Sequence, residues 1–309
     1  MAITAAMVKE LREVSGAGMM DCKKALTATE GDMDKAMEFL REKGLATAQK
    51  KAGRIAAEGI VMLNVSEDGK KAVAVEVNAE TDFVAKNEKF RGYVAQVAEQ
   101  AMDTTAADVE GFLAEPWKFD TNETVGEELA HQIATIGENM NIRRFQQVKE
   151  ENGFVASYIH AGGRIGVLVA GNGASDDAAK EALTNIAMQI AAANPSYLNR
   201  EAVPAEAIEN EKKIIIAQMA NDPKAANKPD AIKEKMAIGK LGKFYKEACL
   251  VDQAFIKDGG MDVKKYVADT AKALGGDIKI ASFTHFTKGE GLEKRNEDFA
   301  AEVAAAIKG

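Results

Sequence analysis

The chain has 309 residues, and 40 Lys and Arg against 48 Asp and Glu give it a formal net charge of −8. This length predicts about two domains, and a hydrophobic fraction of 46% with 28% charged residues is typical of a globular protein. The acidic balance argues against direct binding of nucleic acid, and no apolar run is long enough to span a membrane. Two distant cysteines and no signal-peptide pattern favour a cytoplasmic protein.

Residues that commonly carry enzyme chemistry are sparse. Three histidines and two cysteines offer no pair at metal-binding spacing. The phosphate-binding loop G-x-x-x-x-G-K-S/T and the nucleophile elbow G-x-S-x-G are both absent from the sequence. The glycine-rich run 162–166 lacks the strand–loop–helix context of a dinucleotide site, so we interpret it as a hairpin turn. The composition therefore favours a binding protein, without a metal or cofactor of its own, over an enzyme.

Residues 1–44 are predicted to form three short helices. Met19, Cys22 and Leu26 recur at helical spacing in the second helix, and Gly44 is interpreted as the C-cap of the third. A core of this size is marginal alone, and its pattern is compatible with a three-helix bundle of the ubiquitin-associated type.

From Gly59 the apolar spacing changes from that of helices to that of strands. In chain order we expect a strand at 60–65, a half-buried strand at 72–77, a helix from about Asn87, an irregular stretch at 103–122, a helix at 124–136 and a strand at 141–148.

The order strand, turn, strand, helix and closing strand recurs with an offset of about 94 residues, from Gly59 to Gly153. Its second copy is predicted as strands at 153–159 and 165–169, a helix from about 176 and a closing strand at 277–286. Two similar halves, each a small antiparallel sheet covered on one side by helices, indicate an α+β fold.

The second half also contains charged helices at 206–220 and 230–248, which flank Pro223. We interpret them as a projecting helical hairpin, a coiled-coil arm that could form a homodimer; the alternative is a helical layer on the sheet. The predicted modules are residues 1–54 (three-helix module and linker), 55–150 (first core subdomain), 151–287 (second core subdomain, with the hairpin insertion at about 204–250) and 288–309 (C-terminal helix).

The stretch from Thr81 to Asn87 lies at a strand-to-helix junction, where loops present functional side chains. Thr81 or Asp82 can cap a first turn and Asn87 can cap the main helix, which predicts a short extra turn between them. Phe83 would then lie at an edge. The alternative is that Phe83 continues the buried stripe of Phe90, because aromatic residues at helical spacing usually belong to the core.

Several runs spread over nearly the whole chain resemble the elongation factor Ts family. They are residues 11–26, 81–87, 136–144 and 157–167, with a weaker match at 289–303. The chain departs from the family at Ala79, where a cysteine is frequent, and matches it only loosely in the insertion at 204–250.

The resemblance implies a guanine-nucleotide exchange factor for elongation factor Tu, with no covalent chemistry and no cofactor. Thr81, Asp82, Phe83 and Val84 would enter the partner's GTPase domain and disturb its magnesium and phosphate site, with Phe83 as an apolar wedge. The other contacts that the resemblance implies are Ile136 at the same site, Arg12, Met19, Met20 and Lys23 on the first module, Phe299 and Val303 on the last helix, and His160 against the partner's third domain.

Ordinary structural roles stay open for some of these residues. Only one of Met19 and Met20 can face inward on a short helix, so the other would face a partner. His160 could be a surface histidine near a turn, and Phe299 and Val303 could dock on the protein's own core.

Two other functions also stay open. One is a ubiquitin-binding or helix-binding adaptor that is built on residues 1–44. The other is a small-molecule enzyme that uses the turn at 162–166.

Overall fold

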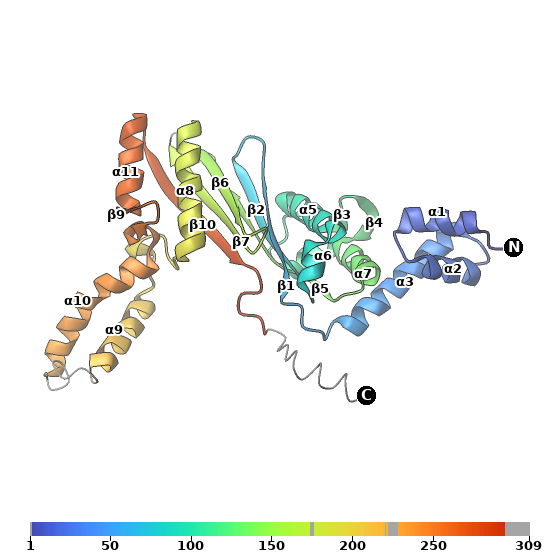
Figure 1. The fold of residues 1–309 in the computed structure, drawn as a ribbon, viewed down its shortest axis with the longest axis horizontal. Coiled ribbons are helices and arrows are strands. Elements are labelled where there is room, and N and C mark those ends of the chain that lie inside the picture. The colour runs from blue at the N-terminus through green and yellow to red at the C-terminus, as the bar shows by residue number, and fades with distance from the viewer. Residues whose placement is uncertain (1, 174–175, 220, 222–227, 294–309) are drawn as a thin grey trace.

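The computed structural model describes residues 2–173, 176–219, 221 and 228–293. Two small antiparallel sheets pack face to face and helices cover their outer faces, so the α+β fold class is confirmed (Figure 1). A three-helix bundle lies at one end of the molecule, and a helical hairpin extends from the other (Figure 1). None of the helices in these ranges combines the length and the apolar character needed to cross a membrane.

The N-terminal bundle packs around a small apolar core in which Leu11, Cys22 and Leu26 are fully buried. Thr4 caps the first helix through its hydroxyl, and Gly16 ends it with a positive φ. The bundle consists of α1 (Ala5–Ser15), α2 (Met19–Ala28) and α3 (Met33–Lys51).

Gly44 is not a C-cap, and that prediction is wrong. It lies inside α3, which continues to Lys51. The basic residues Lys50 and Lys51 therefore belong to the last turn of this helix. Gly44 is buried because α3 packs here on α7 (Val125–Ile136), and a Cβ would lie 3.7 Å from the carbonyl oxygen of Ala130. The glycine thus marks a close approach of two helices.

The first half forms a sheet in the order β1-β2-β5, with α5 against one face. The stretch at 103–122, predicted to be irregular, contains one short helix and most of a short hairpin. The elements are β1 (Glu58–Val65), β2 (Lys71–Ala79), α4 (Asp82–Lys86), α5 (Glu88–Asp103), α6 (Val109–Ala114), β3 (Pro116–Trp117), β4 (Asp120–Thr124), α7 and β5 (Met140–Lys149).

Strand β2 is buried on both faces, so the prediction of a half-buried strand is wrong. Val73, Val75 and Val77 pack in the core beneath α5, whereas Ala72 and Ala74 pack against the second sheet. The alternation of large and small apolar residues thus separates a helix-facing surface from a sheet-facing surface.

The second half repeats this arrangement with the sheet order β10-β7-β6. The sequence did not predict α11 or the hairpin of β8 and β9. Helices α9 and α10 pack on each other around Ile215, Met219 and Leu241 and extend away from the sheet (Figure 1). The elements are β6 (Gly153–His160), β7 (Ile165–Gly173), α8 (Asp177–Ala193), α9 (Ala205–Met219), α10 (Asp230–Ala248), β8 (Ala254–Phe255), β9 (Asp258–Asp262), α11 (Val263–Leu274) and β10 (Ile278–Thr287), with 3-10 turns at Arg200–Ala202 and Leu250–Asp252.

The predicted offset of 94 residues is visible in two reciprocal hydrogen bonds between the halves. The N–H of Val61 donates to the carbonyl of Gly163 at 2.7 Å, and the N–H of Val155 donates to that of Gly69, also at 2.7 Å. Each half thus binds the hairpin turn of the other. The sheets approach closely, since a Cβ at Gly166 would lie 2.5 Å from a methyl carbon of Val61.

Candidate partner-binding site

The short extra turn predicted after Thr81 is present as α4. The Thr81 hydroxyl accepts from the N–H of Val84, and the Asn87 side chain caps the following α5. Asn87 is extended (φ −69°, ψ 131°), so the axis of α4 breaks before α5 begins. Phe83 is therefore 80% exposed while Phe90 is fully buried, and the interpretation of Phe83 as part of the buried stripe is wrong.

The loop that follows α7 holds the start of α4 in place. Glu138 accepts from the N–H of Thr81 at 3.0 Å and from its hydroxyl at 2.6 Å. Glu80 in turn accepts from the N–H of Asn139. Ile136, at the end of α7, is half-buried against the same core as Val84. The structure thus places Ile136 in the core on which α4 packs. The exposed ring of Phe83 therefore projects from a helix that is held in a defined position.

The second half of the chain has no room for a counterpart of α4. Strand β7 ends at Gly173 and α8 begins at Asp177, which leaves only residues 174–176 between them. The corresponding connection in the first half, residues 80–87, holds a five-residue helix. Because the second half forms the same sheet-and-helix unit without it, α4 is not required by this architecture.

Asp82 lies beside Phe83 at the start of α4 and forms an exposed ion pair with Lys86, at 2.6 Å. The hydrogen bond from Lys86, together with the positive charges of Lys86 and Lys288, holds the pKa of Asp82 below its usual value. The tip of α4 therefore presents an exposed aromatic ring and an ionised carboxylate next to each other. Such a pair can insert an apolar group and compete for a cation or a backbone N–H.

The four partner-contact residues predicted on the N-terminal bundle line a single groove of about 560 Å³ between α1 and α2. Met19 and Met20 are 59% and 62% exposed, so the expectation that one of them faces inward is wrong. Both lie in the first turn of α2, and the later residues of that helix fill the core instead. Lys9, Arg12 and Lys23 add positive charge, which makes the groove complementary to an acidic, partly apolar surface.

The glycine-rich run 162–166 forms the hairpin turn between β6 and β7, as predicted, with positive φ at Ala161, Gly162 and Gly163. A strand follows it rather than a helix, so the N–H array of a phosphate loop does not form there. His160 is exposed next to this turn and shares a 3.0 Å hydrogen bond with the Tyr158 hydroxyl. Phe299 and Val303 lie outside the described residues.

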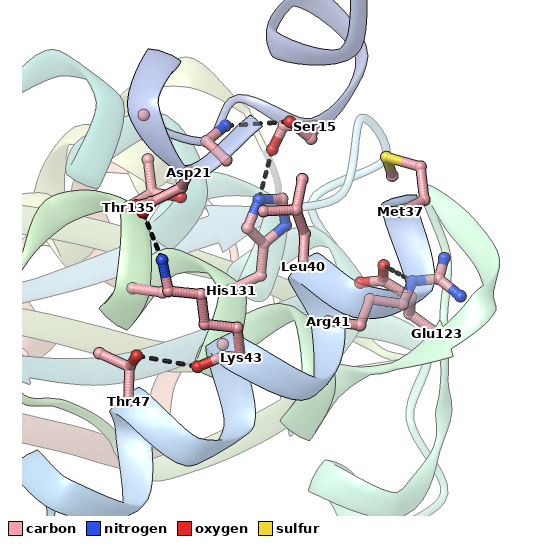
Figure 2. A pocket seen from close by; sticks show the side chains of 14 residues that line it. Ser15, Asp21, Met37, Leu40, Arg41, Lys43, Thr47, Glu123, His131 and Thr135 are labelled. Atoms are coloured by element: carbon pink, nitrogen blue, oxygen red, sulfur yellow. Dashed lines mark hydrogen bonds and ion pairs between the residues drawn. The ribbon is translucent and has the colours of Figure 1, made fainter. Parts of the chain in front are cut away.

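A polar junction between the bundle and α7 was not predicted from the sequence. A pocket of about 160 Å³ lies here, lined by the bundle, by α7 and by Glu123 of β4. Figure 2 shows Arg41, Glu123 and His131 among its side chains. The Nε2 of His131 bonds to the carbonyl of Ser15, and its Nδ1 lies 3.3 Å from Glu128. The spacing of Glu128 and His131, three residues apart on a helix, was the available signal.

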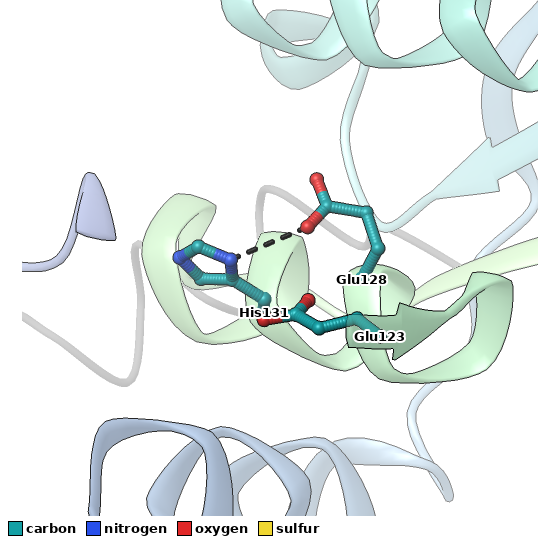
Figure 3. A group of neighbouring side chains, drawn as sticks. All are labelled: Glu123, Glu128 and His131. Carbon is teal, nitrogen blue, oxygen red and sulfur yellow. Dashed lines mark ion pairs between the residues drawn. The ribbon is translucent and has the colours of Figure 1, made fainter. Parts of the chain in front are cut away.

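Donor atoms of Glu123, Glu128 and His131 lie within 4.8 Å of one another, as a cation site would require (Figure 3). Arg41 already pairs with Glu123 at 2.6 Å, and His131 pairs with Glu128. The hydrogen bond with Glu128 raises the pKa of His131, because it outweighs the opposing effect of burial. With the charges balanced by side chains, we interpret the cluster as an ion-pair junction that joins the bundle to the core.

The chain is similar to known proteins over nearly its whole length. A family profile described as "Elongation factor TS" matches residues 80–290. The protein named Elongation factor Ts from Clostridium tetani is 50% identical over 305 residues, which cover 97% of this chain and 98% of that protein. The protein of that name from Clostridium perfringens (strain SM101) is 52% identical over 303 residues and 98% of each chain. The one from Clostridium kluyveri (strain ATCC 8527) is 48% identical over 308 residues and 99% of each chain.

Proposed function

Since the chain belongs to the elongation factor Ts family and is a translation elongation factor, we propose that it acts as a guanine-nucleotide exchange factor on elongation factor Tu. In this proposal the chain binds the GDP form of its partner in the cytoplasm, disturbs the bound magnesium and phosphate, and promotes GDP release so that GTP can enter. It performs no covalent chemistry, and the metal and nucleotide belong to the partner.

One observation carries the proposal: the ring of Phe83 is 80% exposed on a helix that is capped at both ends and absent from the second repeat. An exposed aromatic ring on a fixed element is the kind of side chain that commonly anchors a protein–protein interface. Asp82 accompanies the ring as an ionised carboxylate. We propose that the ring wedges between partner side chains and that Asp82 contacts the backbone or the switch region near the magnesium ion.

The mechanism follows from linkage between two binding equilibria. A factor that binds nucleotide-free elongation factor Tu more tightly than its GDP form must weaken GDP binding by the same factor. Phosphate and magnesium are held by several charge-assisted contacts, so moving the elements that supply them loses many contacts together. The free energy for this distortion comes from contacts made elsewhere in the interface.

We assign those other contacts to separate modules. The groove of the bundle, with Arg12, Met19, Met20 and Lys23, would hold the partner's GTPase domain. His160 would contact the third domain, and the C-terminal module, residues 288–309, would contact the GTPase domain. In this division, residues 1–54 bind the partner, and the subdomains at 55–150 and 151–287 set the distance between the contacts.

The test is release of a fluorescent GDP analogue from elongation factor Tu with and without the chain. We expect Phe83→Ala to slow stimulated release about tenfold to a hundredfold, because burying a phenylalanine ring contributes about 1.5–3 kcal/mol. The complex should still form, although more weakly. Ile256→Ala is the matched control, since Ile256 is an exposed apolar residue on the β8–β9 hairpin. A normal rate with Phe83→Ala refutes the wedge.

The arm of α9 and α10 exposes three isoleucines, Ile214 at 51%, Ile232 at 45% and Ile238 at 58%. We propose that they form a homodimer contact with the arm of a second copy. Sedimentation equilibrium tests this proposal: Ile238→Asp should shift a dimer toward monomer, and a wild-type protein that is monomeric at all concentrations contradicts it.

A further inference from the structure

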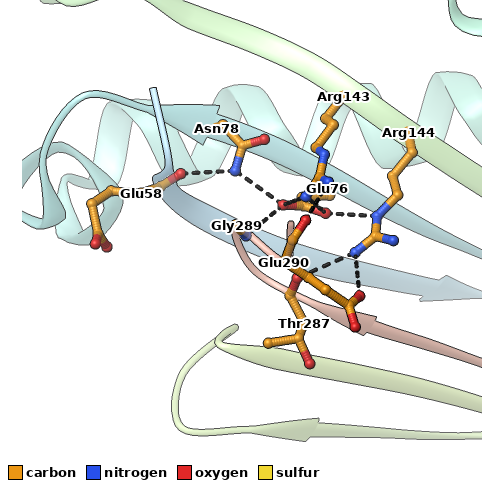
Figure 4. Close-up of polar contacts among 8 residues, drawn as sticks. All are labelled: Glu58, Glu76, Asn78, Arg143, Arg144, Thr287, Gly289 and Glu290. Carbon is orange, nitrogen blue, oxygen red and sulfur yellow. Dashed lines mark hydrogen bonds and ion pairs between the residues drawn. The ribbon is translucent and has the colours of Figure 1, made fainter. Parts of the chain in front are cut away.

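Glu76 is a fully buried carboxylate in the middle of β2, and four side-chain and backbone donor groups form five hydrogen bonds with it (Figure 4). It accepts from the N–H of Gly289 at 2.7 Å, from Asn78 at 3.0 Å, from Arg143 at 3.0 and 3.2 Å and from Arg144 at 2.7 Å. Burial alone would raise the pKa of Glu76, but these hydrogen bonds and the charge of Arg144 hold it below its usual value. Glu76 is thus a buried, ionised carboxylate, and both of its oxygens accept hydrogen bonds.

A β-bulge brings both arginines to this one carboxylate. Neighbouring residues of a strand normally point to opposite faces of the sheet. In the pairing of β2 with β5, however, Glu76 lies opposite Arg144 while Val77 lies opposite Ile142, so Arg143 is an extra residue. The bulge lets Arg143 and Arg144 reach the same side chain.

The second repeat keeps the bulge but lacks the charges. In the pairing of β7 with β10, Ala170 lies opposite Ser282 and Gly171 lies opposite Ile280, so Ala281 is the extra residue. Ala170 takes the place that Glu76 has in the first repeat, and it packs in the apolar contact between the sheets. The bulged sheet therefore forms without an ion cluster, and the charges in the first repeat serve another purpose.

What the cluster holds is the segment that follows β10. Besides the N–H of Gly289, this segment offers the carbonyls of Thr287 and Glu290, which accept from Arg144 at 3.2 Å and from Arg143, respectively. The Glu290 carboxylate also pairs with Arg144, at 3.3 Å. Residues 287–290 are thereby attached to the sheet of the first half (Figure 4).

The attachment brings Lys288 to the base of α4. Its side chain pairs with Glu58, and its N–H donates to the carbonyl of Arg164 at 2.9 Å. Its positive charge is one of the causes that lower the pKa of Asp82. Glu58 lies opposite Ala79 in the pairing of β1 with β2, and Thr81, the N-cap of α4, follows two residues later. Lys288 thus connects the ion cluster to the strand ends from which α4 begins.

We propose that Glu76, Arg143 and Arg144 form a latch that fastens residues 287–290 to the first sheet and, through the pair of Lys288 with Glu58, holds the strand ends from which α4 begins. Glu76 is in this view a positioning residue for nucleotide release, which rests on the exchange function proposed above. The latch acts after the partner is bound, at the step in which the tip of α4 disturbs the metal site. Its loss should therefore lower the maximal rate of GDP release and leave the affinity for the partner nearly unchanged.

The sharpest test transplants the residues of the second repeat into the first, as the triple variant E76A/R143A/R144S. Removing all three charges together leaves none of them buried without its partner, and the second repeat shows that these residues fit the bulged sheet. We expect the maximal rate of fluorescent GDP release to fall about tenfold, while the half-saturating concentration changes less than about threefold. The Gly289 amide should lose its protection from hydrogen exchange.

Lys288→Ala gives an independent test on a half-buried side chain that belongs to none of the apolar clusters. It should reduce the maximal rate as the triple variant does, and the combined variant should show no further loss, because both act through one contact. Arg200→Ala is the matched control, since Arg200 forms an ion pair with Asp252 at 2.6 Å in the second half. It should leave release unchanged.

The outcomes separate the two proposals. If the wild-type chain does not accelerate GDP release, the exchange function fails. If the wild type accelerates release and the triple variant reaches the same maximal rate although its Gly289 amide is unprotected, only the latch is overturned. Strictly additive losses from Lys288→Ala and the triple variant also overturn it, and so does a loss confined to affinity.

Discussion

Thr81 and Glu138 are joined by two hydrogen bonds, since both the N–H and the hydroxyl of Thr81 donate to the Glu138 carboxylate, at 3.0 and 2.6 Å. Thr81 is also the N-cap of α4, so the same residue begins the helix and ties it to the loop after α7. The position of Phe83 therefore depends on a side chain 57 residues further along the chain.

Glu138→Ala is expected to slow stimulated GDP release about tenfold, although the sequence of α4 is unchanged. Without Glu138, α4 is positioned less precisely, so the Phe83 ring is less often in the orientation that disturbs the metal site. The measurement is the release rate at saturating concentration. Glu115→Ala is the matched control: Glu115 also accepts from a threonine hydroxyl, that of Thr104 at 2.6 Å, but this bond joins the ends of α5 and α6 rather than the start of α4. Equal effects of both variants would mean that only general stability was lost.

The groove on the bundle allows a test with two adjacent lysines. Lys23 lines the groove, whereas Lys24 is exposed on the same helix and does not. We expect Lys23→Glu to weaken binding to elongation factor Tu about fivefold to tenfold, more strongly at low salt, because exposed ionic contacts contribute up to about 1 kcal/mol and are screened. Lys24→Glu should leave the dissociation constant within about twofold. Equal losses in both variants contradict a contact specific to the groove.

How much of the site could be read from sequence depended on local signals. The two caps at Thr81 and Asn87 predicted α4, because capping needs only a few adjacent residues. The side chain that holds Thr81, Glu138, lies far away in sequence and carries no local signature. The latch was equally invisible, since its arginines converge only through a bulge, and a bulge breaks the alternation on which strand prediction depends.

The same difference between local signals and long-range contacts explains which parts of the fold could be predicted. The repeat was detectable because its glycines and valines recur at one spacing. In contrast, α11 was missed, although its apolar residues have helical spacing, because it directly follows β9, a short strand that contains two glycines. Gly44 illustrates an ambiguity that sequence cannot resolve. A glycine near the end of a helix fits a C-cap and a close helix contact equally well, and only tertiary packing decides between them.

Gly44 can be used to measure how the bundle is held on α7. A methyl group there would meet the carbonyl of Ala130 at 3.7 Å, an ordinary contact, so Gly44→Ala should leave the docking intact and raise stability by up to about 1 kcal/mol through helix propensity. Gly44→Leu should instead separate the helices and lower the melting temperature. Thermal unfolding followed by circular dichroism measures both. Stabilisation by the leucine variant would contradict the close packing.

The junction around His131 predicts a stability that depends on pH. The hydrogen bond with Glu128 raises the pKa of His131 above its usual value, with smaller contributions from the Ser15 carbonyl and Glu123, whereas burial opposes this change. Because the pKa is higher in the folded state, the stabilisation is complete below the unfolded pKa and is lost as the pH rises through the folded pKa. The protonated imidazole therefore holds the bundle on α7 more firmly than the neutral one.

Thermal unfolding of the wild-type chain should therefore show a melting temperature that falls as the pH rises above about 6.5, the ordinary pKa of a histidine side chain. His131→Asn removes the titrating group, and Glu128→Gln removes its charged partner, so both variants should flatten this part of the profile. If His131→Asn keeps the full slope, another group is responsible and the junction does not control the attachment of the bundle.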